Sequence, residues 1–127
     1  VNFHSFLTDP SPSSFSLPSI VGDTLIECVK SLENKKSTDN LGLCTSFIKS
    51  VIYEITLPLV HILNLSFQTS IIPRQFKITR TVPVFKGGTK EDRSNLNFYR
   101  PIGLINIFSK IMEKLVCNAL TSYFQNT

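Results

Sequence analysis

Basic side chains gather in one stretch of the sequence, from Arg74 to Arg100. This stretch contains two acidic residues and seven basic ones, namely Arg74, Lys77, Arg80, Lys86, Lys90, Arg93 and Arg100. The whole chain has a formal net charge of +4, so its excess positive charge lies in this stretch. A local positive field of this kind attracts the phosphate groups of nucleotides and nucleic acids. A solvated hairpin whose lysines only keep the protein soluble would give the same charge pattern.

No complete catalytic or metal-binding arrangement is recognisable among the other polar residues. Phosphoryl transfer with metal ions needs carboxylates placed to hold the ions, and hydrolysis needs a nucleophile beside a base. The acidic residues are scattered apart from Glu91 and Asp92, and neither His4 nor His61 belongs to a recognisable arrangement with Cys, Ser or Asp. We therefore predict no catalytic residue, no metal ligand and no cofactor in this chain.

The cysteines and the N-terminal sequence indicate a protein of the cytoplasm or nucleus. Cys28, Cys44 and Cys117 are widely spaced and form no CxxC pair, which argues against a disulfide framework or a zinc site. No cationic region followed by an apolar run marks a secretory signal. The most apolar stretch, 51–67, is interrupted by polar residues and by Pro58, and it is shorter than the roughly 20 residues that a bilayer requires. We expect no contact with a membrane.

The spacing of apolar residues predicts a mainly helical chain. Apolar positions recur every three or four residues in three stretches, 23–32, 43–55 and 108–123. Thr56 followed by Leu57 and Pro58 is typical of a helix start, so a separate helix is predicted over 56–69. The first helix is expected to be capped by Asp23, and the last by Asn106 or Ser109.

Between these helices the sequence predicts a basic β-hairpin. The run 77–86 is rich in β-branched residues and predicts a strand, which Pro83 restricts to a sheet edge or a bulge. A glycine-containing turn and a polar loop then lead to a returning strand at 99–102. Residues 1–19 show no steady period and predict a loosely ordered lead-in, while 20–127 form one unit. The expected fold class is α+β, mainly helical with a small basic β-hairpin.

Several blocks of the sequence resemble the N-terminal part of the reverse transcriptases of LINE-type, non-LTR retrotransposons. Four blocks match that family in order and spacing: PRQFK at 73–77, VPVFKGG at 82–88, NFYRPIGL at 97–104 and FSKIMEK at 108–114. Two upstream segments also match, NKKSTD at 34–39 with Gly42, and LPLVHILNLSF at 57–67. The resemblance covers residues 20–124. It implies a partial fingers region of the right-hand fold of reverse transcriptases.

The resemblance also implies roles for two basic residues of the hairpin. In this family two basic strands fold over the incoming deoxynucleotide, and by motif Lys86 would contact its phosphates while Arg100 would grip the α-phosphate side. Lys77, Arg80 and Lys90 are weaker candidates for contacts with the template backbone, and the alternative for them is a solvated face without a ligand. The implied partners are an RNA template, an RNA/DNA duplex and deoxynucleotide triphosphates, and the full-length family enzyme uses magnesium.

The sequence departs from the family pattern at several points. Phe76 replaces a usual Trp, Gly103 replaces the Ser of R-P-I-S, and the family's metal-binding F-x-D and Y-x-D-D blocks do not occur before Thr127. We therefore expect a fragment of an RNA-directed DNA polymerase that does not polymerise alone, with an apolar surface where the missing palm region would pack. The alternatives are a non-catalytic helical module that binds nucleic acid or protein, and a relic of such an element without function.

Overall fold

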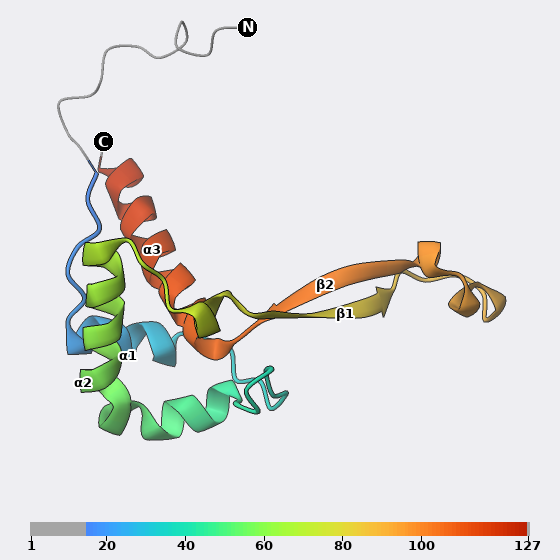
Figure 1. The fold of residues 1–127 in the computed structure, drawn as a ribbon, viewed down its shortest axis with the longest axis horizontal. Coiled ribbons are helices and arrows are strands. Elements are labelled where there is room, and N and C mark those ends of the chain that lie inside the picture. The colour runs from blue at the N-terminus through green and yellow to red at the C-terminus, as the bar shows by residue number, and fades with distance from the viewer. Residues whose placement is uncertain (1–14, 127) are drawn as a thin grey trace, which may run out of the picture.

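The computed structural model describes residues 15–126, so most of the predicted lead-in, residues 1–14, lies outside it. The main elements follow in the order α1 (Gly22–Lys30), α2 (Thr45–Thr69), β1 (Thr79–Phe85), β2 (Tyr99–Ile105) and α3 (Ile107–Gln125). The three helices form one body, and the two strands project from it as a long ribbon (Figure 1). The expected α+β fold class is confirmed.

The core lies where the three helices meet. The apolar side chains that are almost completely shielded from solvent come from all three of them: Leu25, Val29, Ile48, Ile52, Leu63 and Ile111. Burying a side chain of this size stabilises a fold by about 1.5–3 kcal/mol. These positions follow the helical spacing of the sequence, and the predicted helices over 23–32 and 108–123 are confirmed within a few residues at their ends.

Helix α2 corrects the prediction of two separate helices. It continues from Thr45 to Thr69 with Pro58 inside it, and it bends near its middle (Figure 1). Thr56 does not act as a cap, because its hydroxyl donates a hydrogen bond to the carbonyl oxygen of Ile52 at 2.6 Å within the same helix. A proline ring and a threonine bonded back to the preceding turn both favour a bend. Thr56 and Pro58 therefore bend the helix, and they do not end it.

The continuity of α2 also changes what the sequence suggested about membranes. By length and composition alone, this helix is long and apolar enough to cross a bilayer, whereas the prediction had considered the stretch 51–67 too short and too interrupted by polar residues and Pro58. Core helices of soluble proteins meet the same criterion. In this structure α2 places Ile48, Ile52 and Leu63 in the core, against α1 and α3.

The N-terminal ends of α1 and α3 are fixed in different ways. Asn106 caps α3, since its side-chain oxygen accepts a hydrogen bond from the Ser109 N–H at 2.9 Å, as expected. The prediction for α1 is wrong: Asp23 lies in the first turn, and the capping position is Val21, without a side-chain cap. Asn64 of α2 bonds to both backbone groups of Ile20, and this contact fixes the chain where the helix begins.

We expect Asn106→Ala to lower the free energy of unfolding by about 2 kcal/mol. The change removes an N-cap, which costs about 1 kcal/mol alone, and leaves the buried Ser109 N–H and the Gln75 carbonyl without their partner. Urea denaturation followed by circular dichroism measures the effect. Asn126→Ala, at the exposed other end of α3, is the matched control and should stay within about 0.5 kcal/mol of the wild type. Equal losses in the two variants would contradict the capping role.

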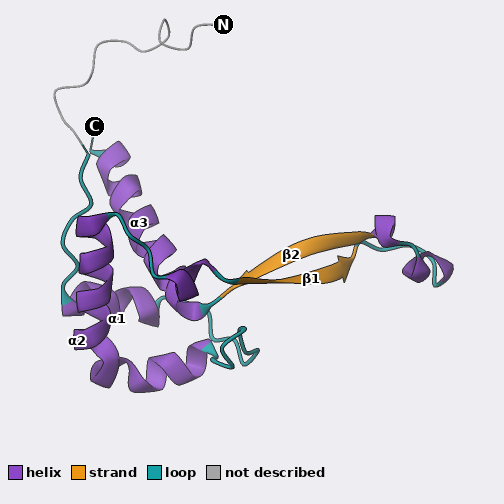
Figure 2. Cartoon of the chain, in the orientation of Figure 1, coloured by secondary structure: helices purple, strands orange, loops and turns teal. Residues whose placement is uncertain are grey.

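The ribbon is a two-stranded antiparallel sheet, so both of its strands are edge strands. The Lys86 N–H donates to the Phe98 carbonyl at 2.8 Å. From this pair onward, hydrogen-bonded residue pairs alternate along the strands with pairs that exchange no backbone hydrogen bond. Pro83 lies opposite Pro101, in a pair that exchanges no backbone hydrogen bonds. Both prolines are therefore tolerated, and the edge-strand prediction for Pro83 is confirmed. Short 3-10 turns lie at both ends of the ribbon (Figure 2).

The base of the ribbon is tied to the helical body by side chains from distant parts of the sequence. One carboxylate oxygen of Asp39 accepts a hydrogen bond from the Ile107 N–H at 2.9 Å, and the other accepts one from the Leu43 N–H at 2.9 Å. The Ser109 hydroxyl donates to the carbonyl oxygen of Phe76. These bonds join the loop between α1 and α2, the start of the ribbon and the start of α3 at one point.

Candidate nucleic-acid interface

The alternation of side chains along the strands separates the ribbon into two faces. Residues directly opposite each other in an antiparallel pair share a face, and Arg80 pairs with Leu104 while Val84 pairs with Arg100. Lys86 continues this series beyond the end of β1. We call this side the basic face; it is formed by Arg80, Val82, Val84, Lys86, Arg100, Ile102 and Leu104.

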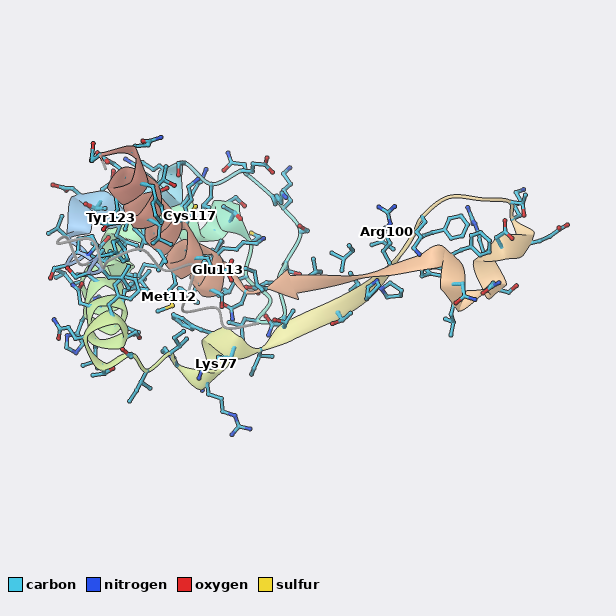
Figure 3. All side chains as sticks on the ribbon, turned by 90° about the horizontal axis from the view of Figure 1, so that it is seen from above. Lys77, Arg100, Met112, Glu113, Cys117 and Tyr123 are labelled. Atoms are coloured by element: carbon cyan, nitrogen blue, oxygen red, sulfur yellow. The ribbon has the colours of Figure 1, made fainter. Side chains whose placement is uncertain are left out.

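The two residues predicted to bind phosphate lie next to each other on the basic face. Arg100 is opposite Val84, and Lys86 is opposite Phe98, so Lys86 and Arg100 are diagonal neighbours with backbones roughly 7 Å apart. Both side chains are exposed. The Lys86 ammonium donates to the carbonyl oxygen of Asn97 at 3.1 Å. Arg100 lies on the ribbon well away from the helical body (Figure 3). Two cations thus face the same solvent region.

The three residues predicted to contact the template are spread along the ribbon. Arg80 is on the basic face but six residues before Lys86, a separation of about 20 Å along an extended strand. Lys77 belongs to the 3-10 turn at the base, and Lys90 precedes the 3-10 turn at the tip. The structure therefore brings Lys86 and Arg100 together and leaves Lys77, Arg80 and Lys90 separate from them.

The tip of the ribbon, where only a polar loop was predicted, has an ordered framework of side chains. The Asp92 carboxylate accepts hydrogen bonds from the backbone N–H and the hydroxyl of Thr89 at 2.8 and 2.9 Å. The rings of Phe85 and Tyr99 lie 5.4 Å apart, and the Arg93 guanidinium lies 5.8 Å from the centre of the Phe85 ring. Arg93 is therefore held beside the aromatic pair, on the face opposite Lys86 and Arg100.

The charge of the basic face is not compensated locally. The strands themselves contain no acidic residue, and the carboxylate of Asp92 at the tip is bonded to Thr89. Within residues 15–126, one ion pair occurs, between Lys35 and Glu33 in the helical body. The same residues contain no group of three His, Cys, Asp or Glu side chains that could hold a metal ion. The arrangement can bind anions, but it does not contain a metal site.

The cysteines lie in different surroundings within the helical body. Burial raises the pKa of the Cys28 thiol, and the positive charge of Lys114 opposes this effect in part. The pKa of the Cys44 thiol is lowered, chiefly by a hydrogen bond with the Ser46 hydroxyl at 3.2 Å. Cys117 is exposed on α3. All three are free thiols.

A second surface feature is an apolar groove between the C-terminal halves of α2 and α3. Its volume is about 670 Å³. We call it the α2–α3 groove; its apolar lining includes Phe67, Ile72, Met112, Val116, Leu120 and Phe124. Met112 and Cys117 mark its position on α3 in Figure 3. The sequence signal for it is the apolar stripe of α3, which continues past the last core residue, Leu115.

Comparison with known proteins identifies a relative of this chain. No protein-family model matches the sequence. The chain is 30% identical over 114 residues to a protein described as a probable RNA-directed DNA polymerase from transposon BS of Drosophila melanogaster. The match covers 90% of this chain, and the chain spans only 12% of that protein's length. This similarity supports an origin of the chain within the reverse transcriptase family.

Proposed function

We propose that this chain is the N-terminal fingers part of a LINE-type reverse transcriptase and that its ribbon binds phosphate groups. The observation that carries the proposal is the placement of Lys86 and Arg100 as exposed neighbours on one face that has no acidic side chain. The similarity to an RNA-directed DNA polymerase supports nucleotides and nucleic acids as the source of the phosphates. The proposed ligands are deoxynucleotide triphosphates, an RNA template and an RNA/DNA duplex.

Lys86 and Arg100 would act on a triphosphate in different ways. The planar guanidinium of Arg100 can donate two hydrogen bonds to two oxygens of one phosphate, while the ammonium of Lys86 acts as a compact charge. Lys86 would exchange its bond to the Asn97 carbonyl for a bond to phosphate. Cations aimed at developing negative charge lower the barrier of phosphoryl transfer. The residues described here do not fit the family's magnesium ions, so this role is confined to binding and orienting phosphate.

Lys77, Arg80 and Lys90 are proposed as contacts for the template backbone. Their separation along the ribbon suits a ligand whose negative charges repeat over a comparable length, as in a polynucleotide strand. A single triphosphate is too short to reach all three. Arg80 is the strongest of these candidates because it shares the basic face with Lys86 and Arg100.

The remainder of the polymerase, including its palm region, is proposed to cover the α2–α3 groove. The groove is lined mainly by apolar side chains, and apolar surfaces of this kind typically mark sites of contact with other protein segments. The matched polymerase is much longer than this chain, which provides a source for such a segment.

The proposal is tested by fluorescence anisotropy of the purified chain with a labelled, primed RNA/DNA duplex over a series of salt concentrations. Binding that weakens steeply with salt is expected, because phosphate contacts release counterions. Magnesium and deoxynucleotides are added to the same samples, and no primer extension by this chain alone is expected. Absence of binding at low salt would contradict the proposal, and primer extension would contradict the expectation that the chain is inactive alone.

A further inference from the structure

A hollow lined by lysines lies between the loop that follows α1 and the first turns of α3. Its volume is about 370 Å³. We call it the lysine hollow; the side chains that line it include Ser31, Glu33, Lys35, Thr45, Lys110 and Lys114. It shares no residue with the pair Lys86 and Arg100 on the ribbon. A count of charges along the sequence does not detect it, because Lys35 lies far from Lys110 and Lys114 in the chain.

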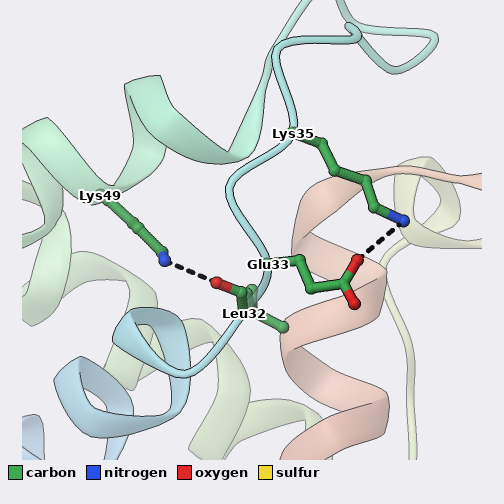
Figure 4. Close-up of polar contacts among 4 residues, drawn as sticks. All are labelled: Leu32, Glu33, Lys35 and Lys49. Atoms are coloured by element: carbon green, nitrogen blue, oxygen red, sulfur yellow. Dashed lines mark hydrogen bonds and ion pairs between the residues drawn. The ribbon is translucent and has the colours of Figure 1, made fainter.

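The positive charge of the lysine hollow exceeds its negative charge. Lys110 and Lys114 are four residues apart in α3, so they lie on the same side of the helix. Like charges at this spacing destabilise a helix slightly. The lining contains one carboxylate, Glu33, which lies 3.2 Å from the Lys35 ammonium. Figure 4 shows this ion pair beside α3. Among the described side chains, no carboxylate forms an ion pair with Lys110 or Lys114.

The loop that forms one wall of the lysine hollow is held in place from two sides. The Lys49 ammonium of α2 donates a hydrogen bond to the carbonyl oxygen of Leu32 (Figure 4). At the other end of the loop, the Asp39 carboxylate accepts a hydrogen bond from the Ile107 N–H at the start of α3. The lysines are therefore gathered on a preformed surface, and binding a ligand there does not require the loop to be ordered first.

The lysine hollow adjoins the base of the ribbon. A smaller neighbouring hollow is lined by Lys35 and Lys110 together with Leu104 and Ile105 of β2. Leu104 lies on the basic face, directly opposite Arg80. The lysine hollow and the basic face therefore adjoin at the base of the ribbon, where the hydrogen-bonded carboxylate of Asp39 also lines the smaller hollow.

We propose that the lysine hollow is a second phosphate-binding site, distinct from Lys86 and Arg100 on the ribbon. Three ammonium groups and the hydroxyl of Thr45 provide donors for phosphate oxygens. The Ser31 hydroxyl already donates to the Cys28 carbonyl at 2.6 Å. The phosphate can belong to a polynucleotide strand that continues along the basic face or to a small phosphate ion. This inference goes beyond the proposed role of the ribbon and does not depend on it.

The site is tested by NMR titration of the full chain, labelled with stable isotopes, with inorganic phosphate in one series and single-stranded oligouridylate in another. The amide signals around Lys35, Lys110 and Lys114 are expected to shift in the oligouridylate series. Shifts there in both series indicate that a phosphate ion alone is sufficient, and shifts with oligouridylate alone indicate that a strand is needed. Shifts confined to the ribbon would overturn the inference while supporting the proposed function. Shifts confined to the lysine hollow would support the inference and contradict the proposed function of the ribbon. Absence of shifts at both places would overturn the inference and the proposed function.

Variants with a matched control provide the second measurement. Lys110→Gln and Lys114→Gln are each expected to weaken oligouridylate binding about threefold at low salt, the size expected for one exposed charged contact. Each should also reduce the slope of log affinity against log salt by about 0.7. Lys30→Gln removes the same charge from an exposed site at the end of α1, outside the hollow, and should leave the slope unchanged. Equal slopes for all three variants would overturn the inference. Thermal denaturation followed by circular dichroism confirms that each variant is folded.

Discussion

Replacing Asp39 with alanine is expected to lower the free energy of unfolding by about 3 kcal/mol. Its carboxylate accepts three backbone hydrogen bonds, from the N–H groups of Leu41, Leu43 and Ile107, at 2.8 to 2.9 Å. Hydrogen bonds to a charged group contribute about 1.5–3 kcal/mol each, and exposed ones contribute less. The bond to Ile107 also spans 68 residues of sequence. Its loss separates the loop after α1 from the start of α3.

Chemical denaturation of Asp39→Ala beside two other variants tests this prediction. Asp23→Ala removes an exposed carboxylate from the first turn of α1 and should cost no more than about 1 kcal/mol. Asp39→Asn keeps one acceptor oxygen and should fall between the wild type and the alanine variant. If Asp39→Ala were as stable as Asp23→Ala, the assigned role of Asp39 would be wrong.

The double change Lys86→Ala and Arg100→Ala is expected to weaken binding of a primed RNA/DNA duplex roughly 30- to 100-fold at low salt. Two charged contacts with phosphate are worth about 2–3 kcal/mol together when they are partly exposed to solvent. Both side chains are exposed on the ribbon and neither contributes to the core, so the helical content should not change. Anisotropy titration measures the affinity, and circular dichroism measures the helical content.

Two further variants identify which property of the pair matters. Arg100→Lys keeps the charge but loses the two-pronged geometry, so its affinity should lie between those of the wild type and the double variant. Arg93→Ala removes a charge from the opposite face of the ribbon and should have a much smaller effect. Equal binding by the wild type and the double variant at low salt would reject the phosphate site.

The fold follows from the sequence wherever one local signal decides the structure. The apolar spacing of α3 and the cap at Asn106 are examples, because both act within a few residues. Pro58 is the opposite case. The same residues are compatible with a helix start and with a bend inside a helix, and burial of Ile52 and Leu63 on either side decides in favour of one continuous helix. The cap predicted at Asp23 failed because Asn64, a distant residue, fixes the chain at Ile20.

In the candidate sites too, local motifs can be predicted from the sequence, whereas contacts between distant residues cannot. The motifs named Lys86 and Arg100, but only the strand register places them on one face, since a shift by one residue would separate them. Lys35 and Lys110 meet in one hollow because the Asp39 bond to Ile107 brings the loop to α3. No motif or periodic spacing in the sequence links Asp39 to Ile107, the two residues that this bond joins. The proximity of Lys35 and Lys110 therefore cannot be predicted from residue spacing or composition.

The one-sided attachment of the ribbon makes it a lever. Its strands are seven residues long, and hydrogen bonds from Asn106 to Gln75 and from Ser109 to Phe76 join the segments flanking their base to the helical body. The strand length of about 23 Å therefore acts as the lever arm. A rotation of about 5° at the base moves the far end by about 2 Å, which is comparable to the length of a hydrogen bond. A change in the packing of Phe76 against Phe108, whose rings are stacked 5.9 Å apart, would therefore move Lys86 and Arg100 further than it moves the base of the ribbon.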